Sequence, residues 1–335
     1  MARLVVTGGM GFIGSAFVRR RLASTRDEVV VVDKLTYAGN PNNLKEHRDD
    51  PRLTFVKGDV CDGGLMDRVA KGADAVVHFA AETHVDRSIL DAGVFVETDV
   101  VGTFRVLEAC RRADVGRLVH ISTDEVYGEA HGAPCTEDAP LVPKSPYAAS
   151  KAGADRLAYS YHATYGLPVV ISRCTNNYGP YQHPEKLIPL FVTNALEDKP
   201  LPVYGSGASI RDWIHVDDHC AALDLLLEAK GIEGEVFNIG ASQERDVRGV
   251  GEAILRILEK PAGLLQAVAD RPGNVRRHAV EWSKIRARLG WSPRKAFDEG
   301  LRETVEWYRG NEWWWRPVKT GAFQGYYEVR YRGLA

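Results

Sequence analysis

The feature that most constrains the fold is a glycine-rich segment between a short apolar strand and a helix. The strand is predicted over Arg3–Thr7, and Gly8, Gly11 and Gly14 follow it at regular spacing. Gly8 permits a tight turn, Gly11 leaves the backbone open to a ligand, and Gly14 lets the helix approach the strand closely. A strand, a glycine turn and a helix in this order are typical of the first unit of a parallel sheet with crossover helices.

Further strands are predicted as short apolar runs between helical stretches. Continuous apolar runs suit parallel strands that are covered on both faces. The runs lie at Glu28–Asp33, Leu53–Lys57, Ala75–Phe79, Arg117–Ser122, Leu167–Arg173 and Glu235–Ile239. We therefore expect an α/β fold, a doubly wound parallel sheet of the Rossmann type with a smaller, mixed α/β lobe that binds the substrate.

The alternation of strands and helices stops near residue 176, where prolines and a Gly-Ser-Gly turn follow. We expect residues 1–175 and 212–240 to form the sheet domain. Residues 176–211 and 241–335 are expected to form the smaller lobe.

The glycine-rich segment predicts a dinucleotide site, because a helix N-terminus offers free N–H groups and a favourable dipole to a pyrophosphate. Asp33 ends the second strand, where a carboxylate accepts hydrogen bonds from a ribose and repels a 2′-phosphate. This favours NAD over NADP, although Lys34 beside it weakens the preference. Asp59 either holds the adenine amino group or caps the following helix. The cofactor residues predicted in these segments are Gly8, Gly11, Phe12, Ile13, Gly14, Asp33, Lys34, Asp59, Val60, Ala80 and Ala81.

A second motif opens a predicted helix with Ser145 as its N-cap and Pro146 in the first turn. Tyr147 and Lys151 are four residues apart and share a helix face. We expect the ammonium group to lie close to the phenol and to lower its pKa, which would make Tyr147 a base near neutral pH. A tyrosine four residues before a lysine can occur by chance in a chain with 13 tyrosines. The motif indicates a site here because it follows a glycine-rich dinucleotide segment.

Seven segments together carry a resemblance to a known family. They are TGGMGFIG at 7–14, AAETHVDRS at 80–88, STDEVYG at 122–128, SPYAASK at 145–151, NNYGPYQHPEKLIP at 176–189, YGSGASIRDW at 204–213 and ADRPGNVRR at 269–277. Over nearly its whole length the chain resembles the extended short-chain dehydrogenase/reductase superfamily and, within it, the nucleotide-sugar 4,6-dehydratases. The resemblance implies a lyase that dehydrates dTDP-glucose to dTDP-4-keto-6-deoxyglucose with bound NAD.

The resemblance also implies residue roles. Thr123, Tyr147 and Lys151 match the superfamily's catalytic triad, and Asp124 and Glu125 match the acid–base pair of the dehydratases. Further cofactor positions are Thr83, Tyr147 and Lys151. The substrate positions that it implies are His84, Thr123, Asn176, Glu185, Lys186, Leu187, Pro202, Tyr204, Arg211, Asn238, Arg271 and Asn274. Asn274 stands where the family often has histidine.

The adjacent acids suit an elimination reaction. Neighbouring carboxyl groups separate each other's pKa values, so a protonated Asp124 can act as the acid beside an ionised Glu125 acting as the base. The alternative for this pair is a helix cap after a strand. Arg211, which follows a Gly-Ser-Gly turn, is expected to bind a diphosphate, with a surface ion pair as its alternative.

Composition excludes other classes. The net charge of −2 lacks the basic surplus of a nucleic-acid binder, and no apolar run is long enough to cross a bilayer. Five scattered cysteines without a C-x-x-C pair, and a start without a signal peptide, favour a reduced, cytoplasmic protein without a metal site. Trp313–Trp315 is expected to pack or to form an interface rather than a membrane belt.

Two further points concern assembly and alternatives. Family members are usually homodimers, and Val94–Ala113 with Ala148–Tyr165 are the helices that could join two copies. The alternatives are a 4-epimerase or decarboxylase on the same scaffold, a dehydratase of another nucleotide-hexose, and a non-catalytic dinucleotide sensor.

Overall fold

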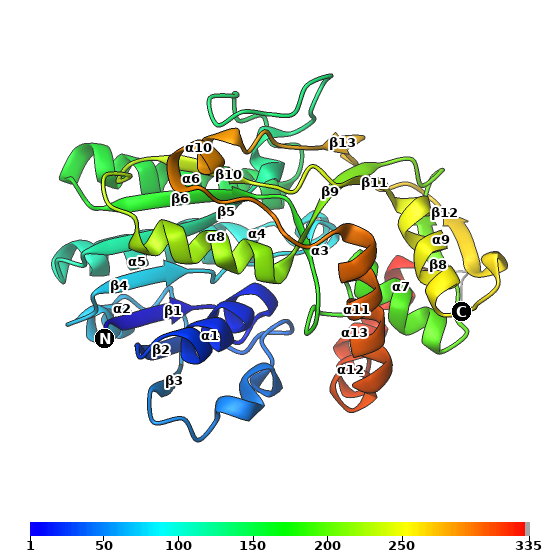
Figure 1. Ribbon diagram of the computed structural model, residues 1–335, viewed down its shortest axis with the longest axis horizontal. Coiled ribbons are helices and arrows are strands. Elements are labelled where there is room, and N and C mark those ends of the chain that lie inside the picture. The colour runs from blue at the N-terminus through cyan, green and yellow to red at the C-terminus, as the bar shows by residue number, and fades with distance from the viewer. Residues whose placement is uncertain (332–335) are drawn as a thin grey trace.

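A large parallel sheet occupies one side of the molecule and a smaller lobe the other (Figure 1). The structure is a computed structural model that describes residues 1–331. The strand order of the large sheet is β10-β6-β5-β4-β1-β2-β3, and every pairing in it is parallel. Its strands are β1 (Arg3–Thr7), β2 (Glu28–Asp33), β3 (Leu53–Lys57), β4 (Ala75–His78), β5 (Arg117–Thr123), β6 (Val169–Cys174) and β10 (Val236–Ile239). The predicted doubly wound sheet is confirmed.

Helices cover both faces of this sheet. They are α1 (Phe12–Ser24), α2 (Gly63–Ala70), α5 (Gly102–Arg112), α6 (Pro146–Tyr165), α8 (Val216–Glu228) and α10 (Ser283–Leu289). Leu4 and Val6 of β1 pack on the face that carries α1, α8 and α10, whereas Val5 packs on the face that carries α2, α5 and α6. Successive side chains of a strand point to opposite faces, so burial of both faces requires the continuous apolar runs seen in the sequence.

The stretch predicted as one helix over Val94–Ala113 contains a change of helix type. After α3 (Val85–Leu90), the chain forms α4 (Gly93–Phe95), a π-helical segment η2 (Val96–Val101) and then α5. A π-helical segment adds a residue to the turn and is frequent at functional sites. Here it carries Asp99, whose contacts are described below.

The smaller lobe combines short strands and helices. Its strands are β7 (Asn176–Tyr178), β8 (Leu201–Tyr204), β9 (Ile210–His215), β11 (Glu244–Asp246), β12 (Leu265–Val268) and β13 (Arg277–His278). Its helices are α7 (Leu187–Leu196), α9 (Val247–Ile257), α11 (Phe297–Gly310), α12 (Glu312–Val318) and α13 (Ala322–Arg330). Short 3₁₀ helices are η1 (Pro41–His47), η3 (Asp124–Tyr127) and η4 (Ala262–Leu264).

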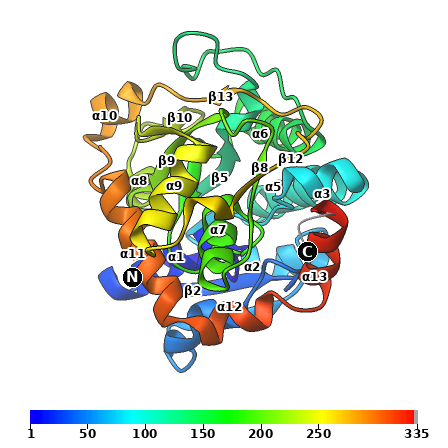
Figure 2. The same cartoon turned by 90° about the vertical axis from the view of Figure 1, so that its right-hand side faces the viewer.

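Strand β9 organises the lobe, because it pairs with β7, β11 and β13, while β8 pairs with β12. It runs across the expected boundary between residues 211 and 212. Figure 2, which views the lobe from its own side, shows α7 and α9 in front of the large sheet.

The core of the lobe is largely aromatic. Trp314 and Trp315 are buried in it with Tyr308 and Phe297, while Trp313 is exposed. Packing therefore accounts for two residues of the tryptophan run, as expected. Within residues 1–331, no helix is both long and apolar enough to span a membrane.

Candidate active site

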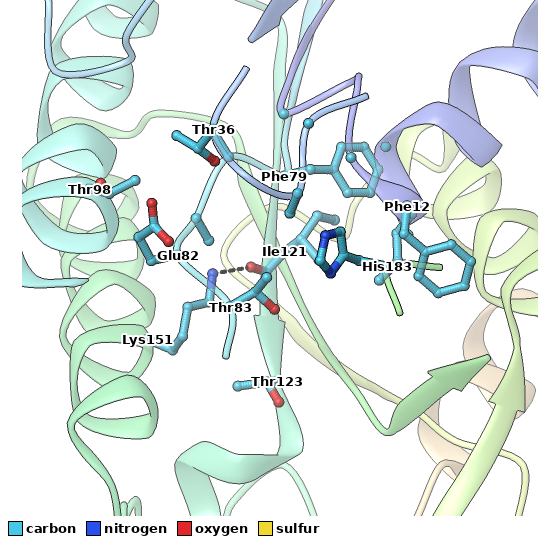
Figure 3. Close-up of a pocket in the computed structure, with 18 of the residues that line it drawn as sticks. Phe12, Thr36, Phe79, Glu82, Thr83, Thr98, Ile121, Thr123, Lys151 and His183 are labelled. Atoms are coloured by element: carbon cyan, nitrogen blue, oxygen red, sulfur yellow. Dashed lines mark hydrogen bonds between the residues drawn. The ribbon is translucent and has the colours of Figure 1, made fainter. Parts of the chain in front are cut away.

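One large cavity lies where the strands of the sheet end at their carboxyl termini. Its volume is about 260 Å³, and part of its lining is drawn in Figure 3. Parallel sheets bind ligands at this edge, because the loops that follow neighbouring strands converge there. The predicted cofactor residues that line the cavity are Gly8, Gly11, Phe12, Ile13, Gly14, Asp33, Lys34, Asp59, Val60, Ala80, Ala81, Thr83, Tyr147 and Lys151.

The glycine-rich loop has the shape that a pyrophosphate requires. Gly8 has a φ of +69°, and a Cβ there would lie 2.6 Å from the backbone nitrogen of Ala80. A Cβ at Gly14 would lie 2.4 Å from the carbonyl oxygen of Gly8. Gly11 is the N-cap of α1, and no side chain caps this helix end. The free N–H groups thus face the cavity at the positive end of the helix dipole, so these residues fit a bound dinucleotide.

The acidic residue after β2 is held in place by the backbone. Asp33 accepts hydrogen bonds from the N–H groups of Met10 at 2.9 Å and Leu35 at 2.8 Å, and burial raises its pKa. Lys34 forms an ion pair with Asp59 at 2.6 Å. Asp62, not Asp59, caps the following helix α2, so the capping alternative for Asp59 is wrong.

The Tyr147–Lys151 motif adopts the predicted helix start but not the predicted electrostatics. Ser145 caps α6 by accepting a hydrogen bond from the N–H of Ala148 at 3.1 Å. The ammonium group of Lys151 donates to the carbonyl oxygen of Ile121 at 2.7 Å (Figure 3). The pKa of Tyr147 is raised well above its usual value by burial and by the carboxyl groups of Glu125 and Asp99. The expectation of a lowered pKa is therefore wrong for the chain by itself, because Lys151 hydrogen-bonds to a strand carbonyl and the nearby carboxyl groups favour the neutral phenol.

Asp99 is a site residue that the sequence reasoning missed. It is 1% exposed and comes from the π-helical segment η2. Its carboxylate accepts hydrogen bonds from the Ser150 hydroxyl at 2.6 Å and from the N–H of Glu82 at 2.8 Å. It thereby joins α6, which carries Lys151, to the loop after β4, and burial raises its pKa to about 6. The sequence around Asp99 does not indicate these contacts, because a single acidic residue within a predicted helix is usually exposed to solvent.

The adjacent acids lie directly after β5. Thr123 caps η3 by accepting a hydrogen bond from the N–H of Glu125, so the capping alternative for Asp124 and Glu125 is wrong. Asp124 is 3% exposed, and its Oδ1 accepts a hydrogen bond from the Thr123 hydroxyl at 3.2 Å. Burial, followed by the neighbouring Glu125, raises the pKa of Asp124 well above its usual value. This direction agrees with the expectation of a protonated Asp124, whose role as the acid stays a prediction.

Three basic side chains, which we call the basic group, lie near Glu125: Lys186, Arg211 and Arg271. A second cavity of about 10 Å³ is lined by Glu125 and Arg271, and Glu125 also lines the large cavity. Arg211 is buried, and burial together with the charge of Arg271 lowers its pKa to about 10. Within residues 1–331 Arg211 makes no ion pair, since its guanidinium donates to the carbonyl of Ile210 and, at 3.5 Å, to Asn274. Its alternative as a surface ion-pair residue is wrong, and an anionic ligand would relieve the repulsion.

Four predicted substrate residues line a cavity: Thr123, Asn176 and Lys186 line the large one and Arg271 the second. Asn176 and Lys186 line the large cavity, where the Lys186 ammonium donates to the carbonyl oxygen of Thr83. Tyr204 donates to Asp86 at 2.9 Å, and Asp86 pairs with Arg271 at 3.2 Å. Positions that line neither cavity are His84, Glu185, Leu187, Pro202, Tyr204, Arg211, Asn238 and Asn274.

Asn238 lies outside the lining of both cavities. Its side chain is fully buried and donates to the carbonyl oxygens of Cys135 at 2.9 Å and Glu281 at 3.0 Å. Its amide oxygen accepts a hydrogen bond from the Tyr127 hydroxyl at 2.8 Å. All three bonds join Asn238 to other parts of the chain and give it a structural role, and its contact with the substrate stays a prediction.

Comparison with known proteins identifies the family. The profile described as GDP-mannose 4,6 dehydratase matches residues 5–304. A dTDP-glucose 4,6-dehydratase from Streptomyces niveus is 52% identical, with 95% of this chain and 96% of that protein covered. The chain belongs to the nucleotide-sugar 4,6-dehydratases and is a member of the dTDP-glucose 4,6-dehydratase family.

Solved structures agree with this family assignment. The dTDP-glucose 4,6-dehydratase DesIV from Streptomyces venezuelae, with NAD and TYD bound, has a TM-score of 0.93 and is 53% identical, covering 95% of this chain and 100% of that chain. A UDP-glucose 4-epimerase from Thermus thermophilus, in complex with NAD, has a TM-score of 0.85 and is 34% identical, covering 92% and 99%. The fold is thus shared with a nucleotide-sugar epimerase as well as with dehydratases.

The raised pKa of Asp124 predicts how the stability of this dehydratase depends on pH. In the unfolded chain the carboxyl group titrates near 3.8, whereas in the folded chain it keeps its proton to higher pH. The unfolded state therefore loses its proton first, and this group destabilises the fold increasingly as pH rises above 3.8. Asn cannot titrate, so the melting temperature of Asp124→Asn relative to the wild type should increase as the pH rises above 3.8. A difference in melting temperature that is constant over this range would contradict the raised pKa.

Proposed function

We propose that the chain is an NAD-dependent lyase that dehydrates dTDP-glucose to dTDP-4-keto-6-deoxyglucose. The observation that carries the proposal is the adjacent pair Asp124, which is buried, and Glu125, which is partly exposed; both line the same cavity as Thr123, Tyr147 and Lys151. The relatives named above support dTDP-glucose as the substrate. An epimerase needs only the triad, whereas elimination of water also needs an acid and a base.

The cofactor would be held by the residues of the large cavity. The N-terminus of α1 would take the pyrophosphate, Asp33 a ribose hydroxyl and Asp59 the adenine end. When bound, NAD⁺ supplies the hydride acceptor for C4, a positive charge that favours the phenolate of Tyr147, and the hydride that returns to C6. Asp33 would disfavour NADP because its carboxylate would repel a 2′-phosphate.

Two hydroxyl groups serve the oxidation at C4. Tyr147 would take the proton of the C4 hydroxyl, and Thr123, which precedes η3, would orient that hydroxyl. Lys151 holds its ammonium group against the end of β5 by its bond to Ile121, which fixes it beneath the cavity that Tyr147 lines. Its charge there interacts with the carboxyl group of Asp99 and lowers the pKa of that group.

The acid–base pair serves the elimination. The C4 ketone acidifies the C5 hydrogen, which Glu125 would remove as a proton. Asp124, kept protonated by burial, would transfer its proton to the C6 hydroxyl, which leaves as water. The electron pair of the C5–H bond forms the C5–C6 double bond. Return of the hydride to C6 and of the proton from Glu125 to C5 would saturate the double bond, so the cofactor would end in its starting state.

The diphosphate of the substrate would bind to the basic group beyond Glu125. Lys186, Arg211 and Arg271 converge there, and burial makes each of these charges costly unless an anion compensates it. Asn274 lies beside this group, and its amide oxygen accepts a hydrogen bond from Arg211. The amide would therefore help to position Arg211 at a place where the family often has a histidine.

The product of the reaction tests the proposal. Incubation of the holoenzyme with dTDP-glucose should yield a sugar nucleotide that has lost one water and carries a 4-ketone, as mass spectrometry and NMR can show. Recovery of dTDP-galactose would instead support the epimerase. Turnover of a different nucleotide-glucose in preference to dTDP-glucose would overturn the assignment of the base.

We also propose that two copies form a homodimer through α5 and α6 and that the protein works in the cytoplasm. Large apolar side chains are exposed at Val94, Val96, Tyr159 and Tyr165, next to or on these helices, which supports an interface there. The five cysteines are unpaired, which suits a reducing compartment. Light scattering that gave the mass of a single chain at micromolar concentration would contradict the dimer.

A further inference from the structure

Trp314, in the tryptophan run of the smaller lobe, forms a hydrogen bond to a residue near the start of the chain. Trp314 is 2% exposed, and its indole N–H donates to the side-chain oxygen of Asn43 at 2.9 Å. These residues lie 271 positions apart, one in α12 and the other in η1. Trp315, by contrast, donates to the carbonyl oxygen of Tyr308 at 2.8 Å, within the lobe.

Asn43 passes this contact on to the glycine-rich loop. Its side-chain N–H donates to the carbonyl oxygen of Met10 at 2.9 Å, and the N–H of Asn40 donates to the same oxygen at 2.9 Å. On the other side, the N–H of Met10 donates to Asp33 at 2.9 Å. The peptide groups of Met10, which lies between Gly8 and Gly11, are therefore fixed on both sides.

A second group of contacts joins Trp314 to another wall of the large cavity. The ring of Trp314 packs edge-on against Tyr181, with the ring centres 5.6 Å apart, and the Arg19 guanidinium lies 4.3 Å from the centre of the Tyr181 ring. Tyr181 has a φ of +67°, a backbone conformation that a bulky residue adopts only when its surroundings impose it. Gln182 and His183, the next residues, line the cavity.

We propose that Trp314 is a positioning residue for the cofactor: its indole N–H orients Asn43, which holds the glycine-rich loop in the shape that binds the pyrophosphate. A loop of three glycines has many conformations open to it, so outside support reduces the entropy that must be lost when the dinucleotide binds. The inference rests on the proposed NAD-dependent function and adds a residue of the distant lobe to its cofactor site.

Trp314→Phe tests the inference, because it retains an aromatic ring and removes the N–H. Loss of one buried hydrogen bond should speed the release of bound NAD about fivefold. The release can be followed by the decrease in protein-bound NAD after rapid dilution. Activity at low NAD should fall and should be restored by excess NAD, which would not happen if the substitution only damaged the fold.

Trp315→Phe is the matched control. It removes an indole N–H from the same helix and the same core, but within residues 1–331 its partner Tyr308 makes no hydrogen bond to residues 8–14, its hydroxyl donating to Gln182 instead. Its NAD release should equal that of the wild type even if its melting temperature falls. Equal release rates in Trp314→Phe and Trp315→Phe would overturn the inference. A wild-type chain that binds no NAD at all would instead overturn the proposed function.

Asn43→Ala provides an independent test should Trp314→Phe fold poorly. It removes both the bond from Trp314 and the bond to Met10, so NAD should again leave faster than from the wild type. The double variant should release NAD no faster than Asn43→Ala alone, because the tryptophan acts through the asparagine. Additive effects would show that Trp314 acts by another route and would contradict the proposal.

Discussion

Replacing Tyr147 with phenylalanine is expected to slow the formation of the 4-keto product by about 10²–10⁴-fold, the usual contribution of a positioned acid or base. Tyr147 lines the large cavity, and its ring packs edge-on against Phe95 with the centres 6.2 Å apart. Phenylalanine keeps this packing and removes only the phenolic oxygen. Because the lost group serves C4 oxidation, no reduced cofactor should appear in a single turnover.

Tyr161→Phe is the matched control for this prediction. Tyr161 lies on the same helix, and its hydroxyl donates to Glu108 at 2.8 Å on the side away from the cavity. Its turnover should stay close to the wild-type value. A Tyr147→Phe variant that matched Tyr161→Phe would remove the phenol from the mechanism.

Replacing Asp124 with asparagine is expected to slow the elimination of water by about 10²–10⁴-fold while leaving C4 oxidation much less affected. Burial raises the pKa of the carboxyl group, so it carries the proton that the leaving hydroxyl needs, and an amide cannot transfer it. The reduced cofactor and a 4-keto-glucose intermediate should therefore accumulate. Both can be followed, the first by its absorbance and the second by trapping with borodeuteride.

Glu125→Gln separates the acid from the base. It should retain C4 oxidation and lose the exchange of the C5 hydrogen with solvent deuterium, whereas Asp124→Asn should retain that exchange. Exchange that persisted in Glu125→Gln would exclude Glu125 as the base. An unchanged elimination rate in Asp124→Asn would exclude Asp124 as the acid.

The parts of the fold that follow from neighbours in the sequence were predictable. Apolar runs such as Glu28–Asp33 and Arg117–Ser122 correspond to β2 and β5, because a strand that is covered on both faces buries most of its positions. The glycine turn and the Ser145 cap are also local, since each depends on the backbone geometry of a few residues. The cavity follows in turn, because parallel strands bring their carboxyl ends to one edge.

The hydrogen-bond partners of buried polar side chains could not be predicted from the spacing of residues in the sequence. Helical spacing placed Lys151 on the same face as Tyr147, yet its ammonium group bonds to Ile121 from another element. Asn238, a position that the resemblance implied, makes three hydrogen bonds to internal partners, and Asp99 bonds to Ser150 and Glu82 from the π-helical segment. A hydrogen bond goes to whichever group the packed chain brings within about 3 Å, and that group often belongs to a distant segment.

The glycine-rich segment shows both levels at once. The sequence by itself determined that Gly8, Gly11 and Gly14 form a turn before a helix, because only residues without a side chain tolerate the positive φ and the close contacts found there. Only the tertiary structure decided how firmly that turn is held, through Asn43 and Trp314 from the far end of the chain. The reason is physical: backbone strain is local to a few residues, whereas a buried hydrogen bond depends on the packing of the whole molecule.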